Sequence, residues 1–255
     1  MVSPFRRRQQ MVRALQSGAA AAAVKSAGAP RPEPEAGTEA GQEYAALRVL
    51  LHADLLKLAD VQSIEARNPM KAEMATAFAD WIEGVLAAGD QGMAAQDEIL
   101  VTNMIWAIDY RDFDYALRLA AHVLKFGLVL PERYNRTPAC FIAEDIAEVS
   151  LAQKDAVSHE QLLAVLGLTE GFDMPDTAKA KLHKAIGRSF ARKAEVFDPA
   201  ADNAPAGGKA AYTEQALEQC KRAFELDQNV GVKSDIRTLE RELKKLSAQK
   251  AEQQE

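Results

Sequence analysis

Apolar side chains recur along most of the chain at intervals of three and four residues, the period of an α-helix with one buried side. The first such segment begins near Glu43 and is marked by Leu47, Leu51, Leu55 and Leu58. Asn68-Pro69 is predicted to end this helix, because a residue that precedes proline is pushed out of the α region. A second helix is predicted over residues 70–88, and the glycines of "AAGDQG" close it.

Further helical segments follow, with short connections between them. They are predicted within residues 94–113 and over residues 114–127, 138–153, 159–166, 176–196, 211–227 and 232–250. Thr137 and Pro138 are typical of a helix start, because threonine caps free backbone N–H groups and proline has none to leave unpaired. Short connections make neighbouring helices pack antiparallel. The pattern predicts an all-α protein, a helical-hairpin array or bundle without strands.

The C-terminal third has its own pattern. Residues 176–196 and 211–227 resemble one tetratricopeptide-type helical hairpin with an enlarged turn. The terminal amphipathic helix spaces its apolar side chains by three, four and three residues, at Ile236, Leu239, Leu243 and Leu246. Two interpretations of this seam stay open. It either caps the preceding hairpin or forms a coiled coil through which copies of the chain associate.

Composition predicts where folding begins. Residues 26–42, "SAGAPRPEPEAGTEAGQ", mix Pro, Gly, Ala and Glu without an apolar period, which is typical of a linker. We therefore expect a flexible basic arm and linker over residues 1–42, a helical domain over 43–168, and a tetratricopeptide-like hairpin plus C-terminal helix over 169–255. With 48% apolar and only 6% aromatic residues, the chain can bury a core while favouring helix.

Charge is distributed unevenly. The chain carries a formal net charge of −6, yet residues 1–42 hold six Lys or Arg and three Asp or Glu. No acid precedes Glu33, whereas the arm carries Arg6, Arg7, Arg8 and Arg13. A basic arm on an acidic body suits a polyanionic partner such as DNA. A solvated leader without a partner is the alternative.

The cysteines and hydropathy bear on the compartment. Cys140 and Cys220 lie 80 residues apart within helical patterns, so the sequence favours neither a disulfide framework nor a zinc site. No stretch approaches the roughly 18 apolar residues of a membrane-spanning helix. We expect a cytoplasmic protein without a membrane partner.

Three carboxylates are the candidates for metal chemistry. Asp97 and Glu98 precede the apolar run "ILVTNMIWAI", and Asp109 follows it. A metal-dependent endonuclease would need such acids to converge on Mg²⁺. However, adjacent helical residues point about 100° apart. Acids before a helix also stabilise its positive end, by about 0.3–1 kcal/mol each. The helix-start interpretation is therefore favoured, and these three residues remain weak catalytic candidates.

Other catalytic signatures are missing from the sequence. The four histidines are isolated, with no His-x-x-x-His pair. The segment "GGKAAYT" lacks the spacing of a nucleotide-binding loop and the Ser or Thr after its lysine. We therefore expect no cofactor, except Mg²⁺ if the endonuclease interpretation holds.

A series of blocks in fixed order carries a resemblance to a known family. The blocks are "QDEILVTNMIWAID" at 96–109, "ALRLAAHVLKFGLVLP" at 116–131, "RTPACFIAEDIA" at 136–147, "DMPDTAKAKLHKAIG" at 173–187 and "GVKSDIRTLERELK" at 231–244. The opening at Ser3-Pro4 and Arg6 to Arg8 adds to it. Over residues 43–246 the chain resembles the small terminase subunit of tailed double-stranded DNA phages, often labelled the terminase endonuclease subunit.

The resemblance implies a protein that initiates genome packaging. Such subunits form homo-oligomers, commonly rings, bind double-stranded phage DNA and deliver it to a large subunit that carries the ATPase and, in most systems, the nuclease. Two departures affect where DNA would bind. The chain ends in the nearly neutral "SAQKAEQQE" instead of a basic tail, and its loop at 198–208 is long. DNA contact is therefore assigned first to the arginines of the arm and second to Lys233, Arg237, Arg241, Lys244 and Lys245.

Three functional hypotheses remain open at this point. The first is a non-catalytic DNA-binding adaptor of a phage terminase. The second is an endonuclease in its own right. The third is a helical-repeat scaffold that binds a protein partner through residues 169–250.

Overall fold

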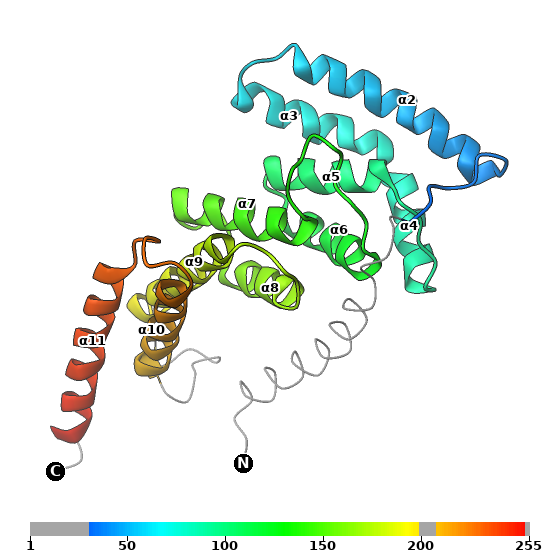
Figure 1. Cartoon of the computed structure of the whole chain (residues 1–255). Coiled ribbons are helices and arrows are strands. Elements are labelled where there is room, and N and C mark those ends of the chain that lie inside the picture. Colours follow the sequence, from blue (N-terminus) through cyan, green and yellow to red (C-terminus); the bar gives the residue numbers. More distant parts are fainter. Residues whose placement is uncertain (1–30, 199–207, 253–255) are drawn as a thin grey trace. The chain divides into compact units, whose positions relative to one another are not determined.

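A computed structural model describes residues 31–198 and 208–252 of the chain. These residues form α-helices and one short 3₁₀ helix, with no strand among them, so the all-α prediction is confirmed (Figure 1). The helices are α2 (Glu39–Ala59), α3 (Ile64–Ala75), η1 (Thr76–Phe78), α4 (Ala79–Asp90), α5 (Glu98–Asp109), α6 (Phe113–Phe126), α7 (Pro138–Ala152), α8 (His159–Thr169), α9 (Asp176–Glu195), α10 (Gly208–Leu226) and α11 (Lys233–Glu252).

The chain divides into two compact units. Among the described residues, the first unit comprises 31–142 and the second comprises 143–198 with 208–252, so the division falls within α7. The predicted boundaries after residues 42 and 168 stay predictions. Within the parts of the chain that the structure describes, no helix combines the length and hydropathy needed to span a membrane.

Helix α5 forms the centre of the first unit. Every residue from Ile99 to Ile108 is buried, as expected for a helix that is apolar around most of its circumference. Helices α2, α3, α4 and α6 all contact α5 (Figure 1). The apolar sides of α2 and α6 supply much of the remaining core, including Leu51, Leu119 and Val123.

The predicted helix end at Asn68-Pro69 is wrong. The first long helix ends at Ala59, and a new helix begins after Ser63, whose side chain accepts a hydrogen bond from the Ala66 N–H. That helix, α3, continues through Pro69. Tertiary contacts around the proline offset its unfavourable effect: Asn68 donates to the Asp109 carbonyl at 2.7 Å, and Lys71 pairs with the Asp109 carboxylate at 2.6 Å.

The start of the first described helix also differs from the prediction. Helix α2 begins at Glu39, four residues before the expected start, with Thr38 as its N-cap. Arg31 is also held in place, because its Nε donates to the Phe126 carbonyl at 2.9 Å. Part of the segment that was predicted to be a linker, from Arg31 onward, therefore belongs to the folded first unit.

The second unit is built around the pair α9 and α10. These helices approach each other closely at Gly187, where an added Cβ would lie 2.7 Å from the Cys220 Sγ. Helix α8 packs on α9, and α11 packs on α10. The predicted hairpin is therefore present, while its likeness to a tetratricopeptide repeat stays a prediction.

Candidate nucleic-acid interface

Helix α11 has three chemically distinct sides. Its apolar side packs against α10. Leu239 on this side is buried, and Ile236, Leu243 and Leu246 are half-buried. The predicted seam therefore lies against the helix's own unit, as the capping interpretation expects, and its role in self-association stays a prediction.

The carboxylates of α11 pair with bases of the two neighbouring helices. Asp235 accepts from Arg188 of α9 at 2.9 Å, while Glu240 and Glu242 pair with Lys221 and Lys209 of α10, each at 2.9 Å. The Lys209 ammonium lowers the pKa of Glu242. The three acids of this helix's described side chains are thus neutralised within the unit.

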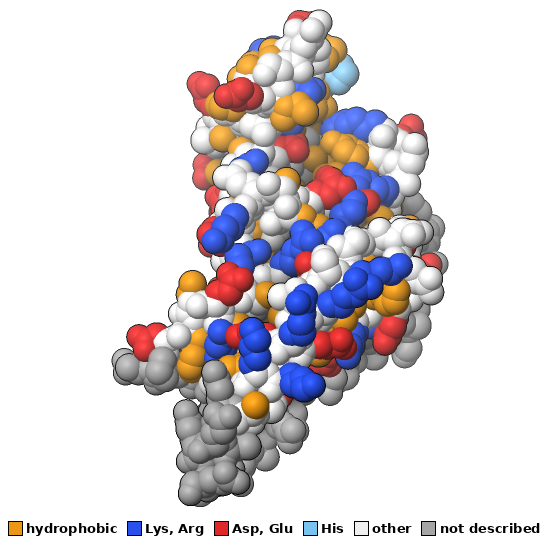
Figure 2. Space-filling model, turned by 90° about the vertical axis from the view of Figure 1, so that its left-hand side faces the viewer, with side chains coloured by type: hydrophobic (Ala, Val, Ile, Leu, Met, Phe, Trp, Pro, Cys, Tyr) orange, Lys and Arg blue, Asp and Glu red, His pale blue; other side chains and the backbone are white. Residues whose placement is uncertain are grey.

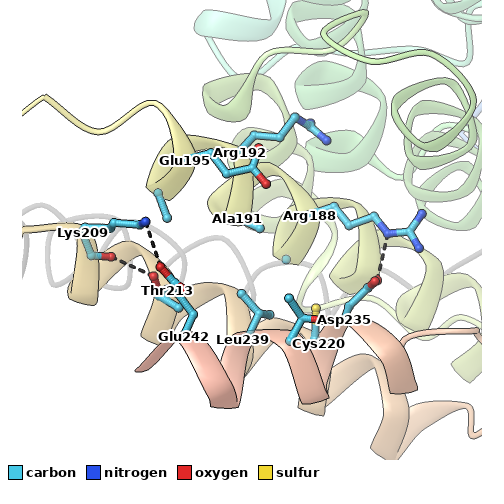
Figure 3. A pocket seen from close by; sticks show the side chains of 13 residues that line it. Arg188, Ala191, Arg192, Glu195, Lys209, Thr213, Cys220, Asp235, Leu239 and Glu242 are labelled. Atoms are coloured by element: carbon cyan, nitrogen blue, oxygen red, sulfur yellow. Dashed lines mark hydrogen bonds and ion pairs between the residues drawn. The ribbon is translucent and has the colours of Figure 1, made fainter. Parts of the chain in front are cut away.

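Two of these ion pairs flank a groove formed by α9, α10 and α11 (Figure 3). The groove is lined by the Arg188–Asp235 pair, the Lys209–Glu242 pair, Arg192 and Leu239, with Cys220 among its lining residues. Burial raises the pKa of the Cys220 thiol to about 11, so the thiol stays protonated at neutral pH. The groove is therefore lined by paired charges and by a buried thiol of low reactivity.

The third side of α11 carries Lys and Arg side chains and no acid. We call it the basic face, and it consists of Lys233, Arg237, Arg241, Lys244 and Lys245. All five side chains are exposed, and within the described residues none forms an ion pair with a carboxylate. Figure 2 views the molecule from the side of α11 and shows Lys and Arg side chains gathered on this surface.

The spacing of the basic face produces electrostatic repulsion within the helix. Lys233, Arg237, Arg241 and Lys245 follow one another at intervals of four residues, and this stripe is about 18 Å long. Like charges at this spacing destabilise a helix by roughly 0.2–0.5 kcal/mol per pair. A bound polyanion would offset that repulsion. The acids of α11 do not offset it, because they already pair with bases of α9 and α10.

The three candidate metal-binding carboxylates are each bonded to other protein groups. Asp97 caps α5, with Oδ1 accepting from the Leu100 N–H and Oδ2 from the Trp81 indole, both at 2.8 Å. Its side chain is buried, and burial raises its pKa above the ordinary value. Glu98 pairs with Arg48 at 3.2 Å.

Asp109 lies at the opposite end of α5 from Asp97, about 18 Å away along the helix axis, and it pairs with Lys71. The fold therefore does not bring the two aspartates together. Among residues 31–198 and 208–252, there is no cluster of three His, Cys, Asp or Glu side chains arranged to bind a metal.

Sequence analysis missed several of these partners. Trp81 and Asp97 are 16 residues apart, and Lys71 and Asp109 are 38 apart. No local spacing rule connects residues at such distances. The arginines of the arm, Arg6, Arg7, Arg8 and Arg13, lie outside the described residues, so their predicted DNA contact stays a prediction.

Fold and surface together define an all-α protein with an exposed cationic helix. The sequence pattern of the phage small terminase subunit family matches residues 48–177. The chain is 37% identical to the protein named "Terminase, endonuclease subunit" of Escherichia phage P2, over 79% of this chain and 74% of that protein. It is 26% identical to the "Probable terminase, endonuclease subunit" of Haemophilus phage HP1, over 77% of this chain and 69% of that protein.

No solved structure matches the chain. The family match covers about half of the sequence, and the phage P2 relative is similar over most of it. The chain belongs to the phage small terminase subunit family, as the resemblance in its sequence blocks predicts.

Proposed function

We propose that this chain is a DNA-binding adaptor that initiates packaging of a phage genome and delivers the DNA to a large terminase subunit. The observation that carries the proposal is the basic face of α11, five exposed cations without a carboxylate partner in the described part of the chain. Family membership supplies the biological setting. The arginines of the arm would add further cations to the same task.

The basic face would bind through phosphate neutralisation. Each contact of a cation with a DNA phosphate releases condensed counterions, so the logarithm of affinity falls with the logarithm of salt concentration by about 0.9 per contact. Such contacts position the protein without reading the base sequence. Several copies acting together would multiply the affinity if their geometry permits simultaneous binding.

A charge-removal variant tests this proposal. Replacing Arg237, Arg241 and Lys245 with alanine is expected to reduce the salt slope of double-stranded DNA binding by about 2.7, since three phosphate contacts are lost. Fluorescence anisotropy over a range of salt concentrations measures the slope. All three side chains are exposed, so the fold is expected to survive.

The matched control removes three cations that already have carboxylate partners. Arg118, Lys193 and Arg222 pair with Glu83, Glu160 and Glu225, respectively. Their triple alanine variant changes the net charge by the same amount. An equal fall in slope for both variants would refute a specific role of α11, because only total charge would then matter.

A second candidate function follows from the names of the relatives. Both are called terminase endonuclease subunits, which favours DNA cleavage by this chain itself. Plasmid nicking by the purified chain with Mg²⁺ or Mn²⁺ tests it. If Glu98→Gln or Asp109→Asn abolishes nicking while DNA binding persists, the chain is an endonuclease and the adaptor proposal is incomplete.

A further inference from the structure

The side of α2 that faces away from its unit is apolar. Tyr44, Leu51 and Leu58 on the inner side are buried, while Val49 is 72% exposed and Leu56 is 57% exposed on the outer side. Helix α2 contacts α3 and α5 but lies at the edge of its unit (Figure 1). Within the described structure, this outer side has no protein partner.

The outer side follows a heptad repeat. Gln42, Ala46, Val49, Ala53, Leu56 and Asp60 are spaced by four, three, four, three and four residues. Between Ala46 and Leu56 this stripe carries no charged residue. A solvent-facing helix side is ordinarily polar, and a 3–4 apolar spacing is instead the pattern by which two helices pack together.

We propose that this surface binds α2 of a second copy of the chain, antiparallel and about a two-fold axis near Leu51. Large residues then face small ones in each layer. Leu56 of one copy lies opposite Ala46 of the other, and Val49 lies opposite Ala53. A two-fold contact must be self-complementary in this way, because the same surface serves both partners.

Charges flanking the stripe fit the same arrangement. Glu43 and Lys57 lie on one edge of it, so the antiparallel register places Glu43 of each copy beside Lys57 of the other. Glu43 has no ion pair among the described residues, and the Lys57 side chain is 60% exposed while it contacts Asp54. In a parallel pair, this edge of one copy would lie beside the opposite edge of the other, which carries Ala45, His52 and Ala59, so Glu43 and Lys57 would not meet. Charge complementarity therefore selects both the partner and its direction.

This inference goes beyond the proposed DNA binding and does not depend on it. The contact uses the first unit, whereas the basic face lies on α11 of the second unit. It also differs from the self-association predicted through the seam of α11, whose apolar side packs on α10. A single helix pair is a small interface, so the association is expected to depend on protein concentration.

Sedimentation velocity of the full chain over a concentration series provides the first test. Replacing Val49 and Leu56 with glutamate is expected to reduce the mass of the assembly by half, since one two-fold contact is lost. Both residues are exposed, so the fold is expected to be retained, and circular dichroism would verify this. The matched control is Val196→Glu, another exposed apolar residue at 80% exposure, which should leave the mass unchanged. An unchanged mass for the α2 variant would overturn the proposal, and a different occupant would then cover this side.

Charge exchange tests the antiparallel direction. Glu43→Lys and Lys57→Glu should each weaken association, because each produces two like-charged contacts. An equimolar mixture of these two variants should restore it, since both contacts then join opposite charges. If the mixture associates no better than either variant alone, the antiparallel register is wrong.

Cross-linking tests the register independently. Leu50→Cys places the two thiols near the two-fold axis, whereas Leu56→Cys places them about 15 Å apart along the helix axis. A bismaleimide shorter than that separation should link copies of the first variant and not the second. Cys140 and Cys220 are buried and should contribute little background. Linking of the Leu56 variant would indicate a parallel pair, in which the two Leu56 positions face each other, and would overturn the proposal. DNA binding by the same variants should be measured separately, so that loss of pairing is distinguished from loss of the basic face.

Discussion

Asp97 joins two helices of the first unit through a single carboxylate. One oxygen accepts from the Leu100 N–H at the start of α5, and the other accepts from the Trp81 indole of α4. Trp81 in turn stacks on Tyr44, whose hydroxyl accepts from the Glu98 N–H. Burial raises the pKa of Asp97, while these hydrogen bonds favour its charged form. The residue that sequence analysis weighed as a metal ligand therefore has an observed structural role.

Asp97→Ala is expected to lower the free energy of unfolding by about 1–3 kcal/mol, because it removes a helix cap and leaves two donors without their acceptor. Urea unfolding followed by circular dichroism measures the loss. Glu98→Ala is the neighbouring control, and it should cost less than about 1 kcal/mol because its ion pair is partly exposed. An equal loss of unfolding free energy in the Asp97 and Glu98 variants would contradict the structural role of Asp97.

Helices α9 and α10 show how packing can require glycine within a helix. Glycine ordinarily weakens a helix by roughly 0.5–1 kcal/mol relative to alanine. At Gly187, however, an added Cβ would lie 2.7 Å from the Cys220 Sγ and 3.2 Å from the Ala216 carbonyl oxygen. A Cβ added at Gly84 in α4 would meet no atom within 4 Å. Alanine at Gly187 would therefore clash with α10, whereas alanine at Gly84 would meet no neighbour and would favour the helix.

Gly187→Ala is expected to lower the free energy of unfolding by about 1–3 kcal/mol through overpacking, and Gly84→Ala is expected to raise it by roughly 0.5–1 kcal/mol. Adding Cys220→Ala to the Gly187 variant should recover part of the loss, so that the double variant is more stable than the two separate effects predict. Thermal unfolding of the original chain, Gly187→Ala, Cys220→Ala and the double variant measures this coupling. Strict additivity would show that the Sγ contact is not the cause.

Three histidines make the stability of the whole chain sensitive to acid. Burial lowers the pKa values of His122, His159 and His183, that of His159 to about 4. His159 lies against Phe190 with a ring separation of 4.4 Å, and its Nδ1 is 3.0 Å from the Ser189 Oγ. A lowered pKa means that the unfolded chain binds the proton more readily than the folded one. The contribution of His159 is therefore fully present above pH 6.5 and is lost as pH falls towards 4.

Between pH 6.5 and 4, the free energy of unfolding of the original chain is expected to fall by roughly 1–2 kcal/mol more than that of His159→Asn, because asparagine does not titrate in this range. Chemical unfolding at several pH values measures the difference between the original chain and the variant. Comparing the two chains removes the opposing effect of Asp97, whose raised pKa makes its own contribution fall as pH rises. Parallel pH profiles would contradict the assignment to His159.

Helix positions could largely be predicted from the sequence, whereas the partners of individual charges could not. The spacing of Leu51 and Leu58 defines the inner side of α2, and the apolar run before Asp109 predicts a buried α5. The basic face could be located on α11 from the spacing of its residues. The exception among the helices is α3, where contacts of Asn68 and Lys71 with Asp109 keep the chain helical past Pro69. Local rules identify helices because their hydrogen bonds and caps join near neighbours.

By itself, the sequence determined the all-α class, the family and the chemical sides of α11, because each depends on residue type and short-range spacing. Only the tertiary structure decided that Asp97 and Asp109 bond to other residues at opposite ends of one helix. It also decided that the acids of α11 are neutralised while its bases are exposed, and that the outer side of α2 lacks a partner within the described chain. Long-range contacts of this kind depend on how helices pack in space, which no local periodicity specifies.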